Sequence, residues 1–242
     1  HSLGNLLLVA MEEITGDLVS AIKEVSKVLA VRGRVLPATL QQVVLAAELR
    51  NGVLMTGETA IRQAEEGIHR VFLLPPDCRP LDETLEAIAA AEAVILGPGS
   101  LYTSLIPNLL VRGVAEALRC SPAPKIYVAN IMTEKGETDG HTLSDHLAAI
   151  DAHVGPGLVD YVLVHRGALP QALLDRYRAE GAEPVAVDAA ALQARGEAVV
   201  MRRLARRDDV AWHDPELLAR TVMRLVRRRG GAEGGARREL LP

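Results

Sequence analysis

Residues 93–104 read Ala93-Val94-Ile95-Leu96-Gly97-Pro98-Gly99-Ser100-Leu101-Tyr102-Thr103-Ser104, a short apolar run followed by glycines and hydroxyl side chains. Four consecutive apolar residues that end at turn residues are typical of a strand buried on both faces of a parallel sheet. Glycine lets the backbone turn sharply and approach other atoms closely, so Gly97 and Gly99 predict a tight turn after this strand. The stretch therefore predicts an α/β fold with a donor-rich loop at the end of one strand.

Similar apolar runs recur along the chain, at residues 71–74, 126–129 and 161–164. The segments between and after them are long enough for crossover helices, which we predict at residues 82–91, 109–118, 144–153 and 169–179. Strands that alternate with helices predict a Rossmann-like three-layer sandwich with a mostly parallel sheet. In such a sheet, ligands bind beyond the carboxyl ends of the strands, so the loop after each strand is a candidate site.

Both ends of the chain add further elements. Residues 6–11 and 18–31 have helical apolar spacing and predict a helical hairpin, and Asn51-Gly52 between two apolar runs predicts a β-hairpin nearby. Residues 184–187 and 198–201 are candidate late strands. Asp214-Pro215 predicts the start of a final helix, whose apolar stripe could pack on the domain or on a partner. We expect residues 1–228 to form one domain and residues 229–242 a disordered tail.

Composition excludes several classes of partner for this 242-residue chain. Aromatic residues make up 2% of it and its net charge is −4, which argues against a nucleic-acid-binding surface. No apolar run approaches the roughly 18 residues that a membrane-spanning helix needs. We therefore expect a cytoplasmic protein without a membrane span, and we expect it to form a homo-oligomer.

The loop after residue 96 is the first candidate site. Its glycines allow an anion to approach the backbone, and the hydroxyls of Ser100, Thr103 and Ser104 can donate to phosphate oxygens at the start of a helix. The same residues would also suit a tight turn between a strand and a helix, with the hydroxyls as caps.

The loop after residue 129 is the second candidate site. Residues 130–142 gather an asparagine, threonines, acidic residues and a histidine. They could hydrogen-bond a sugar or hold Mg²⁺ through carboxylates, although carboxylates in loops are more often solvated. His141, His146 and His153 lack the spacing of a zinc motif, so capping or surface roles are favoured over a metal site.

Five short segments carry a resemblance to a known family. They are residues 1–5, 14–17, 32–37, 96–104 and 132–139. In this order they resemble the gluconeogenesis-factor family, which is similar to the 2-phospho-L-lactate transferases (CofD-like proteins). The resemblance implies a regulatory protein that binds a UDP-sugar such as UDP-N-acetylglucosamine or another phosphorylated small molecule. It also implies roles in cell shape and envelope synthesis during growth on gluconeogenic carbon.

Two other functions stay open. One is a Mg²⁺-dependent transferase of a phosphorus-containing group, similar to 2-phospho-L-lactate transferase, for which Mg²⁺ would be the cofactor. The other is a structural fragment that acts only as an interaction module. We assign no catalytic residue and no metal ligand.

The residues predicted to bind ligand come from these loops and from the resemblance. They are Gly97, Pro98, Gly99, Ser100, Tyr102, Thr103, Ser104, Asn108, Asn130, Thr133, Glu137, Thr138, Tyr177 and Asn5. The resemblance also implies a ligand-binding arginine at the position that Trp212 occupies in this chain. Tryptophan can stack on a ring but cannot pair with a phosphate.

The front of the chain departs from the family pattern. Members begin with a strand followed by a Gly-Gly-Gly-Thr-Gly turn and an Asp-Asp-Gly-Gly segment, and neither of these two motifs occurs here. We therefore expect a truncated or split domain that lacks its first strand and helix. Its sheet should lack a neighbour along one side.

Overall fold

The central sheet has four parallel strands. The computed structural model describes residues 3–206 and 210–230. Strands β4 (Val94–Leu96), β5 (Lys125–Val128), β6 (Tyr161–His165) and β7 (Ala198–Arg202) lie side by side in the order β4-β5-β6-β7. This confirms the predicted α/β fold. Of the described strands, β4 pairs with β5 alone, so this edge of the sheet is open.

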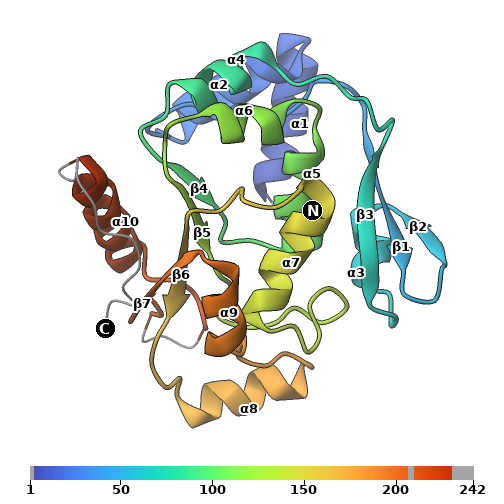
Figure 1. Cartoon of the computed structure of the whole chain (residues 1–242). Helices are drawn as coiled ribbons and strands as arrows, with labels where there is room; N and C mark the ends of the chain where they lie inside the picture. The colour runs from blue at the N-terminus through green and yellow to red at the C-terminus, as the bar shows by residue number, and fades with distance from the viewer. Residues whose placement is uncertain (1–2, 207–209, 231–242) are drawn as a thin grey trace.

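Side chains of the sheet alternate between two covered faces. Ile126 and Val128 pack with Leu225 of α10 (Pro215–Gly230), whereas Tyr127 packs on the face covered by α7 (Leu143–Val154). Figure 1 shows α10 on one side of the sheet and α7 on the other. Burial of both faces explains why these strands read as continuous apolar runs. The apolar stripe of α10 therefore packs on the domain, which was one of the two alternatives predicted for it.

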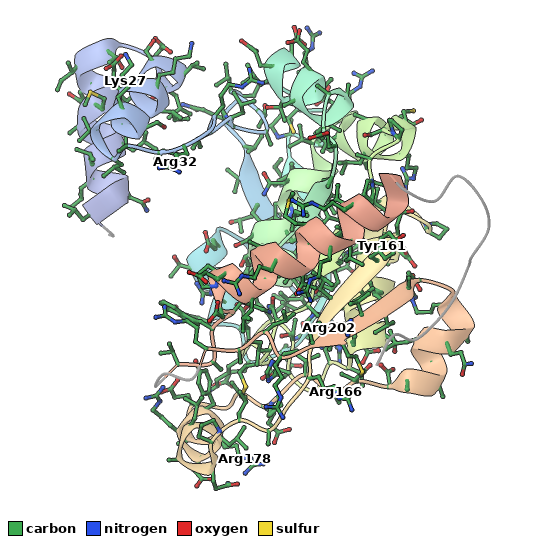
Figure 2. The ribbon with its side chains drawn as sticks, turned by 90° about the vertical axis from the view of Figure 1, so that its left-hand side faces the viewer. Lys27, Arg32, Tyr161, Arg166, Arg178 and Arg202 are labelled. Carbon is green, nitrogen blue, oxygen red and sulfur yellow. The ribbon has the colours of Figure 1, made fainter. Side chains whose placement is uncertain are left out.

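A helical hairpin and a β-hairpin precede this sheet, as predicted. Helices α1 (Leu3–Thr15) and α2 (Leu18–Val28) meet at a turn where the Asp17 side chain accepts a hydrogen bond from Ser20 N at 2.9 Å. Figure 2 shows this helical hairpin standing away from the rest of the molecule. Strands β1 (Val44–Leu49) and β2 (Leu54–Thr56) pair in antiparallel fashion around a turn in which Gly52 has φ +83°.

The predicted strand at residues 71–74 belongs to a different sheet. It is part of β3 (Ile68–Leu74), which pairs with β1 in an antiparallel sheet of order β2-β1-β3, so the parallel assignment was wrong. Val71 and Leu73 are buried, while Leu74 is exposed. An apolar run signals burial but does not reveal the direction of the neighbouring strand.

Two other predicted elements differ from the structure. Residues 184–187 form isolated bridges at Pro184 and Ala186 rather than a strand, because they run beside the loop that follows β5. The predicted helix at residues 109–118 is divided into α5 (Ile106–Leu110) and α6 (Val114–Cys120) by extended backbone at Val111.

The remaining helices are short, and the described chain ends within a helix. They are α3 (Glu58–Arg62), α4 (Asp82–Ala89), α8 (Gln171–Ala179) and α9 (Ala189–Arg195). Helix α10 extends to Gly230, and the rest of the predicted tail lies outside the described residues. Among the described helices, none combines the length and the apolar character needed to cross a membrane.

Removing the N-cap of α10 is expected to lower the free energy of unfolding. The Asp214 Oδ1 atom accepts from Glu216 N at 2.9 Å and Leu217 N at 3.0 Å. Asp214→Ala should therefore cost about 1 kcal/mol in urea unfolding, whereas Asp214→Asn, which can still cap, should cost a few tenths. An equal loss in both variants would contradict a role in capping.

Candidate functional site

The two predicted loops lie against each other. Strands β4 and β5 are neighbours, so the turn that begins at Gly97 follows β4 next to the end of β5. Gly97 has φ +82°, and a Cβ atom at this position would lie 3.2 Å from the Val128 carbonyl oxygen. Both the conformation and the close approach require glycine here. The turn is therefore built to sit directly against the neighbouring strand.

Glu134 joins the two loops. Its Oε2 atom accepts a hydrogen bond from the Ser100 hydroxyl at 2.5 Å, and its Oε1 atom accepts one from Asn130 Nδ2 at 2.9 Å. Its backbone N–H donates to the Thr138 hydroxyl at 2.8 Å. The structure thus brings Ser100 and Asn130 together through the Glu134 side chain, and Thr138 through the Glu134 backbone N–H, although our candidate residues did not include Glu134.

Glu137 occupies the start of the helix after the glycine turn. This π-helix, η1 (Leu101–Leu105), directs the N–H groups of Tyr102 and Thr103 at the Glu137 carboxylate, at 3.2 and 3.3 Å. The Thr103 hydroxyl donates to the same group at 2.7 Å, and Arg62 Nε lies 3.7 Å away. A phosphate could use these donors only by displacing Glu137, and their role in binding a ligand stays a prediction.

The buried position of Glu137 affects its protonation. The side chain is 1% exposed, and this burial raises the pKa of its carboxyl group, while the hydrogen bond from Thr103 acts in the opposite direction. A carboxylate held inside the protein by its own chain is suited to fixing a loop.

The acidic side chains of this site do not fit Mg²⁺ in this conformation. Glu134 and Glu137 both use their two oxygens to accept hydrogen bonds from the chain. Within residues 3–206 and 210–230, no group of three or more His, Cys, Asp or Glu side chains is placed to hold a metal ion. These carboxylates hold the two loops together instead.

Two backbone donors at the glycine turn have no partner. The N–H groups of Gly99 and Ser100 make no hydrogen bond to any residue that the structure describes. Gly99 is exposed, so a ligand can reach this position from solvent. Successive backbone N–H groups in a turn form a concavity that favours anions. Binding of a phosphate oxygen at this corner, which would not displace Glu137, stays a prediction.

A cavity of about 240 Å³ opens beyond the ends of β5 and β6. Asn130 and His165 are the polar side chains that line it. The apolar side chains around them include Ile131, Leu143, Val164, Leu169, Leu174 and Val185. Leu174 belongs to α8, which Figure 1 shows beyond the end of β6. The cavity therefore lies where an α/β sheet is expected to bind its ligand.

Sequence reasoning missed His165. This residue directly follows the apolar run at 161–164, and the rule that singled out the loops after residues 96 and 129 applies equally to it. Burial lowers the pKa of its imidazole, and the nearby Arg203 adds to this effect. The ring is therefore favoured in its neutral form.

The other predicted ligand residues are more scattered. Thr133 is buried and accepts from Glu183 N at 2.9 Å, and Asn108 is exposed and donates to the Ser104 carbonyl at 2.7 Å. The Tyr177 hydroxyl accepts from Ala211 N at 3.2 Å, beside the cavity wall. Asn5 belongs to α1, and Figure 2 shows the helical hairpin of α1 and α2 standing away from the rest of the molecule.

Of the three histidines in and after the second loop, His141 and His146 are buried and His153 is half-buried. His146 is fully buried and shares a hydrogen bond of 2.9 Å with the Tyr127 hydroxyl. His141 is buried beside Tyr102, and His153 accepts from Val71 N at 2.9 Å. The expectation of a surface role was therefore wrong for His141 and His146. These rings belong to the core between the sheet and β3.

Comparisons with known proteins agree with this architecture. The family profile described as 2-phospho-L-lactate transferase CofD matches residues 1–205. The gluconeogenesis factor of Halalkalibacterium halodurans is 48% identical over 224 residues, covering 92% of this chain and 70% of that protein. The gluconeogenesis factor of Bacillus subtilis is 43% identical over 228 residues, covering 94% and 72%.

A solved structure agrees as well. The crystal structure of a UPF0052 family member from Bacillus halodurans, 48% identical in sequence, superposes with a TM-score of 0.88 and covers 92% of this chain and 72% of its own. Trp212, which occupies the position where the family resemblance implied an arginine, has a relative exposure of 62%. On these matches, the chain belongs to the gluconeogenesis-factor family of CofD-like proteins.

Proposed function

We propose that this chain binds a nucleotide sugar, UDP-N-acetylglucosamine or a close analogue, as a non-catalytic regulatory protein. In this proposal it acts in the cytoplasm and links gluconeogenic growth to cell shape and envelope synthesis. The observation that carries it is the position of Asn130. This side chain lines the cavity and is joined through Glu134 to Ser100, whose backbone N–H is free.

A ligand with two chemically different ends fits this arrangement. The cavity is smaller than the roughly 300–1,000 Å³ of a typical small-molecule site, so it suits one ring rather than a whole nucleotide sugar. The free N–H groups of Gly99 and Ser100 suit an anion. A ring in the cavity and a diphosphate at the glycine turn would place the ligand across Asn130.

Calorimetric titration with UDP-N-acetylglucosamine tests this proposal. We expect a saturable heat signal with one site per chain, and we expect uridine, which lacks the diphosphate, to bind at least about tenfold more weakly. Absence of heat at millimolar ligand would overturn the proposal.

Asn130→Asp provides the matching variant. It removes the donor to Glu134 and places two carboxylates next to each other, so binding should fall by about tenfold or more. Gln193→Glu, an equivalent change on the exposed face of α9, should bind as the original chain does. If the original chain, Asn130→Asp and Gln193→Glu bind UDP-N-acetylglucosamine equally well, the cavity is not part of the nucleotide-sugar site.

A phosphotransferase function is the alternative, because the matching family profile is described as a 2-phospho-L-lactate transferase. Such a reaction depends on stabilising the transferred phosphoryl group, commonly by Mg²⁺. The carboxylates of Glu134 and Glu137 are already engaged by the chain, which favours the regulatory role. Formation of a product from a phospho-lactate-linked nucleotide and a deazaflavin acceptor would reverse this ranking.

A further inference from the structure

His165, which lines the cavity beyond β5 and β6, carries one hydrogen-bond donor without a partner among the described residues. The Nδ1 atom of His165 accepts hydrogen bonds from the backbone N–H groups of Leu204 and Ala205, both at 3.0 Å. An imidazole nitrogen that accepts carries no proton, so the proton of the neutral ring must be on Nε2. Gly167 approaches the ring, but Nε2 is buried and completes no hydrogen bond with any described residue. A buried N–H group without a partner is unfavourable, so a ligand acceptor that reached this atom would satisfy it.

The same cavity presents one defined acceptor. Asn130 donates through Nδ2 to Glu134, and an ionised carboxylate can only accept hydrogen bonds. This fixes the orientation of the amide, because the reverse orientation would set two acceptors against each other. The Oδ1 atom of Asn130 then has no hydrogen-bond partner among the described residues and remains an acceptor.

The rest of the lining excludes a charged group. Among the residues that the structure describes, no Lys, Arg, Asp or Glu side chain lines the cavity, and the other lining side chains are apolar. A phosphate or carboxylate would enter it without a compensating charge, which is strongly unfavourable. An uncharged group is favoured, and it must offer a hydrogen-bond acceptor to His165 and a donor to Asn130.

We propose that this cavity recognises an amide or imide group on the ligand, with His165 Nε2–H donating to its carbonyl oxygen and Asn130 Oδ1 accepting from its N–H. The inference rests on the proposed binding of a nucleotide sugar and names the part of that ligand that enters the cavity. Two parts of UDP-N-acetylglucosamine have this chemistry. They are the uracil imide edge and the acetamido group of the sugar.

Two substitutions of His165 separate recognition from a structural role. The oxygen of Asn in His165→Asn can replace Nδ1 as acceptor for Leu204 and Ala205, but the variant lacks a donor at Nε2. The longer His165→Gln can place an amide N–H near the Nε2 position, but loses the Nδ1 acceptor. We expect His165→Asn to bind UDP-N-acetylglucosamine at least tenfold more weakly, and His165→Gln to remain within a few-fold of the original chain.

If the role of His165 were purely structural, His165→Asn would bind UDP-N-acetylglucosamine more tightly than His165→Gln. Thermal unfolding of both variants reports that role independently, and His165→Asn should be the more stable of the two. If the original chain binds UDP-N-acetylglucosamine and His165→Asn binds it equally well, the proposed function stands and this inference is overturned.

Two analogues identify which part of the ligand enters. UDP-glucose lacks the acetamido group, and CDP-glucose lacks both that group and the imide, since cytosine presents an amine and an unprotonated N3. Weak binding of UDP-glucose assigns the acetamido group to the cavity. Tight binding of UDP-glucose with weak binding of CDP-glucose assigns the uracil. Equal affinity for all three ligands would overturn the inference.

Nuclear magnetic resonance of the histidine side chains decides the remaining case. If UDP-N-acetylglucosamine does not bind, the proposed function fails, and uridine and N-acetylglucosamine are titrated separately at millimolar concentration. A shift of the His165 Nε2–H signal by either compound would support amide recognition by this cavity. If neither uridine nor N-acetylglucosamine shifts this signal, amide recognition by the cavity is overturned as well.

Discussion

Replacing Gly136 by alanine is expected to destabilise the protein by about 3 kcal/mol. Gly136 has φ +84°, a left-handed conformation that costs other residues about 1–2 kcal/mol. A Cβ atom there would also lie 2.6 Å from the backbone oxygen of Arg62 and 3.3 Å from that of Ala64. Because these atoms belong to backbone, overpacking adds about 1–3 kcal/mol. The loop that carries Glu134 and Glu137 would be forced away from the end of α3.

Gly140 supplies the matched control for this prediction. It also has a positive φ, of +67°, but a Cβ atom there would meet nothing within 4 Å. Gly140→Ala should therefore show only the backbone strain, about 1 kcal/mol. Urea unfolding of the two variants measures the difference, with the midpoint shifting at constant slope. Equal losses would mean that the contact with Arg62 contributes nothing.

The strands of the parallel sheet could be predicted because burial on both faces leaves a strong signal in the sequence. The runs at 93–96, 126–129 and 161–164 all form strands of this sheet. The run at 71–74 carries the same signal, yet it pairs with a hairpin in another sheet. Strand direction depends on the path of the chain between strands, which local apolar patterns do not encode.

The candidate site was predicted at the level of loops rather than of side chains. Neighbouring parallel strands end at the same edge, so the meeting of the loops after β4 and β5 follows from strand order. The Glu137 carboxylate accepts hydrogen bonds from the N–H groups of Tyr102 and Thr103. The sequence could not predict this contact, because carboxylates in loops are usually solvated. The contact depends on the approach of a distant segment, 34 or 35 residues away in sequence.

A row of ring side chains connects the parallel sheet to β3. The His146 ring lies 6.0 Å from that of His141, which lies 6.1 Å from Tyr102, and Tyr102 lies 5.9 Å from His153. Burial lowers the pKa of His146 to about 4, and the neighbouring His141 contributes in the same direction. The Nε2 atom of His146 has no hydrogen-bond partner among the described residues, so a charge on this ring would be uncompensated.

Lowering the pH should therefore destabilise the protein through His146. The unfolded chain binds a proton at this residue near pH 6.5, while the folded protein resists doing so until about pH 4. The stability contributed by the neutral ring is complete above pH 6.5 and is lost progressively as the pH falls to about 4. The full difference corresponds to about 3 kcal/mol, of which about 2 kcal/mol should be lost at pH 5.

The free energy of unfolding at pH 7.5 and pH 5 measures this loss. His146→Asn retains an acceptor near the Tyr127 hydroxyl but cannot titrate, so its stability should fall about 2 kcal/mol less between these pH values. Burial likewise lowers the pKa of His153, so part of the slope should persist in His146→Asn. If His146→Asn follows the original chain at both pH values, the buried ring is not what makes the fold sensitive to acid.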